Sequence, residues 1–226
     1  MKTKSYDRTQ LVLSSELMQQ VYRLCALSPL RPSRMAYNLT ISHHHRFIWF
    51  RVAKTATRTL FSHFRNHNIP LDAEHPYQVR YSERYYRSYF KFSFVRNPWD
   101  RVVSAWVNKV VDHNRWNFDE ATLRELQEFR NFVTYLETLD LSVCDQHLRR
   151  QSDLIDLNNL DFLGRFESFD RDFAEVCHRL GLPDYEPAVH NQSPKRNDYR
   201  SYYDDALAER VSNLYRKDIQ LFNYTF

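Results

Sequence analysis

Hydrophobic residues recur along this chain with two periods, one typical of strands and the other of helices. Residues 46–52, RFIWFRV, form a short aromatic and β-branched run, and residues 89–95, YFKFSFV, alternate phenylalanine with polar residues. Residues 161–167, DFLGRFE, form a third short run of this kind. Each pattern predicts a β-strand.

A helical pattern follows each predicted strand. After the first strand, Leu60, Phe61 and Phe64 recur at helical spacing, and Thr57 is a candidate N-cap. After the second, a helix is predicted to begin at Pro98-Trp99, because proline is tolerated in a first turn, and to run to residue 111. Further helices are predicted over residues 119–138, opened by Asp119, over 168–180, capped by Ser168 and closed by Gly181, and over 204–222.

Strands that alternate with helices are typical of an α/β domain with a parallel sheet. The prediction is one α/β domain over residues 43–226, with a P-loop-like parallel sheet flanked by helices. Residues 1–42 are predicted to form an N-terminal helical arm, whose helix over 10–27 ends before Ser28-Pro29 because a residue before proline avoids the helical region.

The composition narrows the class of protein. A hydrophobic fraction of 42% and an aromatic fraction of 15% argue against disorder. The chain has no run of 18 apolar residues and no signal-peptide core, so no transmembrane segment is predicted and a cytoplasmic location is the default expectation. Three cysteines at irregular spacing fit a reducing compartment. Peripheral membrane association and oligomeric state stay open.

Arginine dominates the basic residues of this chain. It supplies 25 of the 32 basic side chains, and arginine is suited to planar, bidentate recognition of anions. The net charge of only +4 and the dispersed acidic residues disfavour a nucleic-acid partner. Only two glycines are present, Gly164 and Gly181, which excludes the glycine-rich phosphate-binding loops.

Two predicted strand–loop–helix junctions carry candidate chemistry. The first spans residues 51–60, where Lys54, Thr57, Arg58 and Thr59 stand at a helix N-terminus that suits phosphate. Taken alone, this pattern is also typical of ordinary helix capping.

In the second junction, Arg96 follows a strand and Ser104 lies eight residues further on, in the next helix. Ligands of open parallel sheets bind beyond the carboxyl ends of the strands, so both side chains are candidates to converge on one anion. The alternative is a surface salt bridge between Arg96 and Asp100.

Together the two junctions resemble the signatures of the family 2, membrane-type carbohydrate sulfotransferases. Val52 to Leu60 resembles their first signature, and Phe94 to Trp106 resembles their second almost letter for letter. Weaker similarity covers Asp145 to His147 with Gln151, residues 161–167 and the C-terminal tyrosines, so that the resemblance extends over residues 45–226. The chain departs from the pattern at Ala56, where many members have glycine, and at Arg58, where a small hydroxyl residue is common.

This resemblance implies a sulfotransferase-like domain that uses 3′-phosphoadenosine 5′-phosphosulfate (PAPS) and releases adenosine 3′,5′-bisphosphate (PAP), with no metal required. Lys54 would contact the bridging oxygen and stabilise charge on the leaving phosphate. Arg96 and Ser104 would clamp the 3′-phosphate. The remaining contacts to the 5′-phosphosulfate would come from the loop residues Thr55, Ala56, Thr57, Arg58 and Thr59.

The resemblance also implies a general base and an acceptor hydroxyl. Many family members carry a histidine between the two signatures, and His75 lies there in this chain. His147 is the second candidate base, or else a substrate-orienting residue. Lys195 and Arg196, in a basic loop, are candidates to meet an anionic acceptor.

The predicted function is therefore transfer of a sulfuryl group from PAPS to a hydroxyl, with a carbohydrate as the expected acceptor. Two alternatives remain at this point. One is a nucleotide-dependent phosphoryl transferase, a kinase, on the same type of fold. The other is a non-catalytic nucleotide- or anion-binding module.

Overall fold

The computed structural model describes residues 32–187 and 198–226. The helix predicted over residues 10–27 lies outside these residues, as do Lys195 and Arg196.

A four-stranded sheet in the order β1-β2-β3-β4 forms the centre of the described chain. Its strands are β1 (Leu39–Ser42), β2 (Phe47–Phe50), β3 (Phe90–Val95) and β4 (Phe162–Arg165). The pairs β2–β3 and β3–β4 are parallel, whereas β1 runs antiparallel to β2. The three predicted strands and the α/β class are therefore confirmed.

Strand β1 belongs to the segment that the sequence assigned to the N-terminal arm. Its four residues pair with all of β2, from Leu39 opposite Phe50 to Ser42 opposite Phe47. The sheet thus begins before the predicted boundary at residue 43. The short tetrapeptide LTIS carries little signal of its own, and the partner strand across a tight turn is what makes it a strand.

Seven α-helices surround the sheet in the described chain. They are α2 (Thr57–Asn66), α3 (Pro98–Trp106), α4 (Glu120–Leu126), α5 (Phe129–Glu137), α6 (Phe169–Leu180), α7 (Asp205–Leu214) and α8 (Arg216–Phe222). A π-helical turn, Val107–Val111, extends α3 to the end predicted for it.

Two of the predicted helices are each divided into two. The stretch 119–138 breaks before α5 because Glu128 takes an extended conformation, and the stretch 204–222 breaks at Tyr215. The Tyr215 side chain is buried and its hydroxyl donates to the Leu148 carbonyl at 2.6 Å. This long-range contact fixes where the chain turns, which a helical period alone does not reveal.

The helix ends follow the predictions with two exceptions. Ser168 stands at the N-cap of α6 as predicted, but its hydroxyl donates to Asp172 and makes no capping hydrogen bond to the backbone. Asp119 caps α4 through its side chain, Pro98 is the first residue of α3, and Gly181 ends α6 in the left-handed region at φ 59°. The N-cap of α2, however, is Ala56 rather than Thr57, which is the first helical residue.

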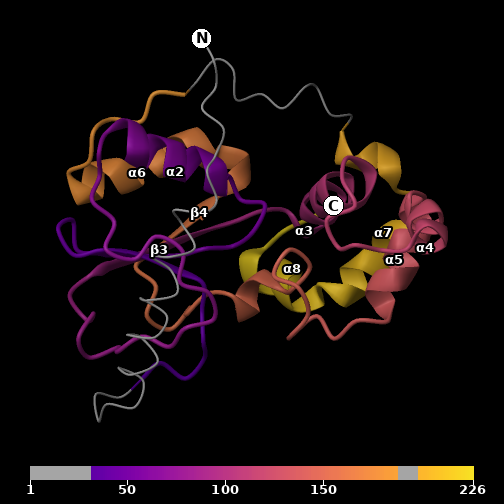
Figure 1. Cartoon of the computed structure of the whole chain (residues 1–226), viewed down its shortest axis with the longest axis horizontal. Helices are drawn as coiled ribbons and strands as arrows, with labels where there is room; N and C mark the ends of the chain where they lie inside the picture. Colours follow the sequence, from indigo (N-terminus) through magenta and orange to yellow (C-terminus); the bar gives the residue numbers. More distant parts are fainter. Residues whose placement is uncertain (1–31, 188–197) are drawn as a thin grey trace.

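The two faces of the sheet pack against different helices. Phe47 and Trp49 point to the side covered by α2 and α6, which lie side by side in Figure 1. Their neighbours Ile48 and Phe50 point to the opposite side, where the core includes residues of α3, α5 and α7. The alternation follows from the two-residue period of a strand.

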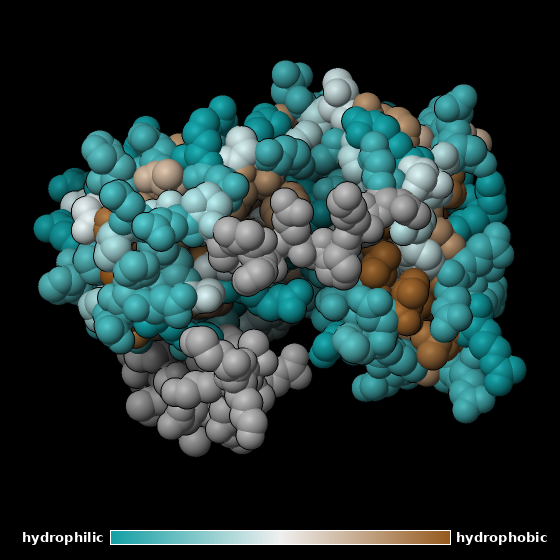
Figure 2. All heavy atoms as spheres, turned by 90° about the horizontal axis from the view of Figure 1, so that it is seen from above, coloured by the Kyte–Doolittle hydropathy of each residue, from teal (hydrophilic) through white to brown (hydrophobic). Residues whose placement is uncertain are grey.

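Hydrophilic residues cover most of the face seen in Figure 2, and hydrophobic residues gather in a small patch over the side that holds α4, α5 and α7. Within the described residues, no helix is both long and apolar enough to cross a membrane.

Gly164 in β4 leaves space for a neighbouring ring. A Cβ atom at this position would lie 2.4 Å from Cε1 of Phe94, a side chain that is fully buried. We therefore expect Gly164→Ala to lower the free energy of unfolding by about 1–3 kcal/mol, because overpacking forces core atoms to shift. Urea denaturation measures this change.

The Phe94→Leu background tests the cause of this destabilisation. Removing the ring opens space beside position 164, so Gly164→Ala should cost less there than in the wild-type protein. Equal costs in both backgrounds would show that the close contact with Phe94 is not responsible.

Candidate active site

The two junctions named by the sequence leave the same edge of the sheet. Strands β2 and β3 are parallel neighbours, with Phe50 opposite Ser93. The loop 51–56 after β2 and the turn 96–97 after β3 therefore emerge beside each other. The helices α2 and α3 begin at this edge.

The backbone of the first loop alternates in handedness. Lys54 and Ala56 have φ angles of 73° and 63°, whereas Thr55 between them stays out of the left-handed region. Alternation of this kind turns successive N–H groups into one concavity that suits an anion. The N–H groups of Thr57 and Arg58, the first two of α2, have no carbonyl one turn earlier to bond and add to the same positive end, whereas the Thr59 N–H donates to the Ala56 carbonyl at 2.9 Å.

Three carbonyl groups of the loop accept hydrogen bonds from side chains. The Val52 oxygen accepts from the hydroxyls of Thr55 at 2.9 Å and Thr57 at 3.3 Å. The Ala53 oxygen accepts from Arg101 Nε at 3.1 Å, and the Lys54 oxygen accepts from Arg96 Nη1 at 3.0 Å. These bonds fix the orientation of three consecutive peptide groups.

Thr55 is completely buried, so its hydroxyl shapes the loop. The cofactor contact predicted for Thr55 stays a prediction. Ala56, Thr57 and Thr59 are partly buried, and Arg58 is exposed at the start of α2.

Arg96 connects the two junctions. Its Nη1 donates to Ser104 Oγ at 3.1 Å as well as to the Lys54 carbonyl, and its Nε donates to Asp100 at 2.7 Å. The predicted proximity of Arg96 and Ser104 is confirmed, and the alternative pairing with Asp100 is present at the same time. Burial lowers the pKa of the Arg96 guanidinium to about 10, which leaves it cationic at neutral pH.

Donors remain on this pair of side chains. Within residues 32–187 and 198–226, Nη2 of Arg96 has no hydrogen-bond partner. The Ser104 hydroxyl accepts from Arg96 and so keeps its own proton to donate. The centroid of the Phe166 ring lies 4.0 Å from the Arg96 guanidinium carbon, so the ring packs against the guanidinium group.

Arg101 is a positioning residue that the sequence reasoning missed. Its side chain is fully buried and bonds three carbonyl oxygens, those of Ala53 at 3.1 Å, Gln146 at 2.8 Å and Arg149 at 2.9 Å. It therefore ties the first loop to the segment after α5. Its place in the second signature was the available signal, since an arginine stands there in the pattern.

The same mid-chain segment is fixed by polar contacts on its other side. The Gln151 amide exchanges two hydrogen bonds with the backbone of Arg96, at 2.9 and 2.8 Å. The Asp218 carboxylate, fully buried, accepts from the backbone N–H groups of Gln151 and Ser152. These hydrogen bonds hold Gln151 and Ser152 against the end of β3 and against α8.

His75 lies between two charged side chains. Arg51 Nη1 lies 3.1 Å from Nδ1 of the ring, and because arginine can only donate, Nδ1 is the acceptor and Nε2 carries the proton. Nε2 lies 3.6 Å from Glu74. Burial, with the Arg51 and Arg65 cations, lowers the pKa of His75 to about 3. In this arrangement neither ring nitrogen has a lone pair that could take the proton of the substrate hydroxyl.

His147 pairs with a carboxylate instead. Asp145 Oδ1 lies 2.7 Å from His147 Nδ1 and also accepts from the His147 backbone N–H at 2.9 Å. Burial opposes ionisation of Asp145, but the hydrogen bonds from His147 outweigh it and lower the carboxyl pKa to about 2. Burial also lowers the pKa of His147, and Asp145 partly offsets this.

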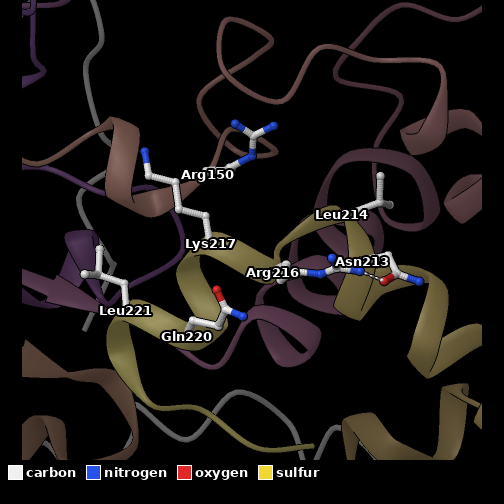
Figure 3. A pocket seen from close by; sticks show the side chains of 7 residues that line it. All are labelled: Arg150, Asn213, Leu214, Arg216, Lys217, Gln220 and Leu221. Atoms are coloured by element: carbon white, nitrogen blue, oxygen red, sulfur yellow. Dashed lines mark hydrogen bonds between the residues drawn. The ribbon is translucent and has the colours of Figure 1, made fainter.

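A surface hollow of about 630 Å³ lies elsewhere, between α8 and the segment before it (Figure 3). Arg150 and Lys217 line it and share the Asp153 carboxylate, and Arg216 bonds to Asn213. None of the residues that were predicted to bind the cofactor lines this hollow.

Comparison with known proteins identifies the family. The model of the Sulfotransferase family matches residues 37–225, and the chain belongs to this family. The resemblance to family 2 carbohydrate sulfotransferases that the two signatures carry is thereby confirmed.

The chain is similar to several curated proteins. It is 24% identical over 196 residues to carbohydrate sulfotransferase 14 of Danio rerio, covering 71% of this chain and 53% of that protein. It is 26% identical over 168 residues to carbohydrate sulfotransferase 11 of Rattus norvegicus, covering 62% and 48%. The chain thus spans about half the length of these relatives. No solved structure matches it.

The position of His75 predicts a pH dependence of stability. Its folded-state pKa of about 3 lies below the ordinary value of 6.5, so the unfolded chain binds the extra proton between these values. The free energy of unfolding should therefore fall as the pH drops from about 6.5 towards 3. In His75→Gln, which lacks the imidazole, we expect a shallower fall over this window in urea denaturation series.

His113→Gln serves as the control, because His113 is an exposed histidine outside both junctions. If His75→Gln left the pH slope as steep as the control does, His75 would have to bind its proton over the same pH range in the folded and the unfolded protein.

Proposed function

We propose that this member of the Sulfotransferase family transfers a sulfuryl group from PAPS to a hydroxyl group, and that the acceptor is a carbohydrate. The observation that carries the proposal is the buried Arg96, which joins the loop of Lys54 to Ser104. It sets two anion-binding places beside each other at one sheet edge. PAPS carries two separate anionic groups, a 5′-phosphosulfate and a 3′-phosphate.

The first loop suits the 5′-phosphosulfate. Its alternating backbone and the N-terminus of α2 gather N–H donors without any glycine, and Lys54 adds a cation. The Lys54 and Ala53 carbonyl oxygens are bonded to Arg96 and Arg101, which lowers their repulsion of an anion at the loop. In a sulfuryl transfer, such preorganised donors stabilise the charge that develops on the leaving phosphate.

The second place suits the 3′-phosphate. Nη2 of Arg96 and the hydroxyl of Ser104 are donors held in fixed positions by the carbonyl of Lys54, by Asp100 and by Phe166. Hydrogen bonds to a charged group contribute about 1.5–3 kcal/mol each. This second place favours PAPS over ATP, whose phosphates form a single chain.

The carbohydrate acceptor is supported by the relatives and not by any feature of this chain alone. The two animal proteins described above are named as carbohydrate sulfotransferases. In this chain, the hydroxyl to be sulfated would approach Lys54 from solvent, next to the segment 145–149 that Arg101 holds against the loop.

The experiment compares nucleotide binding by calorimetry in wild type and Arg96→Lys. Lysine has one point charge and cannot reproduce the donors of the arginine fork. We expect PAP affinity to fall about 10- to 150-fold, corresponding to about 1.5–3 kcal/mol. AMP affinity should fall by a smaller factor, because AMP loses only the support that Arg96 gives to the Lys54 carbonyl. Arg124→Lys is the matched control, because Arg124 forms an exposed ion pair with Glu120 on α4.

Equal weakening of PAP and AMP in Arg96→Lys would contradict a 3′-phosphate clamp. Binding of ATP with Mg²⁺ by the wild type, without binding of PAP, would favour a phosphoryl transferase. PAP binding without transfer of radiolabelled sulfate to any carbohydrate in an acceptor panel would favour a non-catalytic nucleotide-binding module.

A further inference from the structure

We propose that His147, held by Asp145, is the general base that takes the proton of the acceptor hydroxyl. This inference rests on the proposed function and assigns its base to the segment after α5. It replaces His75, the residue favoured by the family resemblance, in that role.

The hydrogen bonds of the pair determine which nitrogen can act. The Asp145 carboxylate only accepts, so the 2.7 Å contact requires a proton on Nδ1 of His147. The neutral ring then carries its lone pair on Nε2. No hydrogen-bond partner of Nε2 occurs among the residues that the structure describes. A base oriented by a third group in this way is the arrangement that activates nucleophiles in other enzymes.

His75 offers the opposite arrangement. Arg51 donates to its Nδ1, and the protonated Nε2 lies towards Glu74. A proton gained by this ring would also meet the cation of Arg51 at 3.1 Å. For His147 the neighbouring carboxylate stabilises the imidazolium that forms when the base takes a proton.

A single guanidinium joins the pair to the transfer loop. Arg101 donates to the Ala53 carbonyl, next to Lys54, and to the Gln146 carbonyl, between Asp145 and His147. The Gln146 side chain is fixed as well, because its Oε1 accepts from Asn38 Nδ2 at 2.6 Å. The base and the loop predicted to hold the phosphosulfate are therefore set against each other by buried contacts.

The surroundings of His147 suit a base near neutral pH. Its side chain is 20% exposed, so solvent reaches part of it while most of it is packed. Burial and the cations Lys109 and Arg101 lower its pKa, and Asp145 raises it. The neutral form, which is the form that accepts a proton, is favoured at pH 7.

In the transfer step, sulfur exchanges the bridging oxygen of PAPS for the oxygen of the acceptor hydroxyl. The acceptor oxygen forms a bond to sulfur as the bond between sulfur and the bridging oxygen breaks, and that electron pair leaves with the 5′-phosphate of PAP. The acceptor proton moves to Nε2 of His147. Asp145 keeps its charge and stabilises the imidazolium until the proton passes to solvent.

The test measures turnover and PAP binding together in His147→Gln. A positioned base contributes about 10²- to 10⁴-fold, so we expect kcat to fall by about this factor while PAP affinity stays within about twofold of the wild type. His75→Gln is measured beside it, and its fall in kcat should be much smaller. His113→Gln controls for loss of an exposed imidazole.

Asp145→Asn tests the positioning residue through the pH profile. Loss of the carboxylate lowers the pKa of His147, so the acidic limb of the kcat profile should move to lower pH as kcat falls. A merely structural role for Asp145 would lower activity without moving that limb. Asp145→Glu should restore part of the rate.

The outcomes separate this inference from the proposed function. Absence of PAP binding by the wild type would overturn the proposed function itself. Normal PAP binding with full turnover in His147→Gln, or a larger loss of turnover in His75→Gln, would overturn the assignment of the base and leave sulfuryl transfer standing.

Discussion

The carbonyl groups of Ala53 and Lys54 are held by two buried guanidinium groups, Arg101 and Arg96, that follow the neighbouring strand. A charged group leaves water at a large cost unless the protein replaces its hydrogen bonds. Arg101 meets this condition with three carbonyl oxygens, and Arg96 with a carbonyl, a hydroxyl and a carboxylate. Because these acceptors lie in the first loop, in α3 and in the segment 146–149, satisfying the two charges fixes how those three segments are placed.

The same contacts organise the electrostatics of the site. With the loop carbonyls bound to arginine, the N–H groups of the first loop and the start of α2 remain to meet an anion. The two histidines differ in their neighbours, because Nδ1 of His75 contacts the Arg51 guanidinium, whereas Nδ1 of His147 contacts the Asp145 carboxylate. Charge distribution, more than the number of histidines, decides which ring can take up a proton.

The C-terminal tail completes the second junction. Glu167 accepts from the Asn97 backbone N–H and from the Tyr224 hydroxyl, and Asn97 donates from its side chain to the Thr225 carbonyl. The last residues of the chain therefore pack against the turn that carries Arg96. The second junction and the C-terminal tail therefore lie together, although 128 residues separate Asn97 from Thr225.

The sequence by itself determined the three parallel strands, the starts of α3 and α4, the end of α6 and the two junctions, because each depends on local period, capping or an unusual pair of residues. Only the tertiary structure decided that β1 joins the sheet, that Tyr215 divides the last helix and that Arg101 spans three segments. It also separated His75 from His147, because the protonation of a ring depends on charged groups from other segments. Local sequence specifies short-range geometry, whereas burial and long-range hydrogen bonds become known only when distant segments meet.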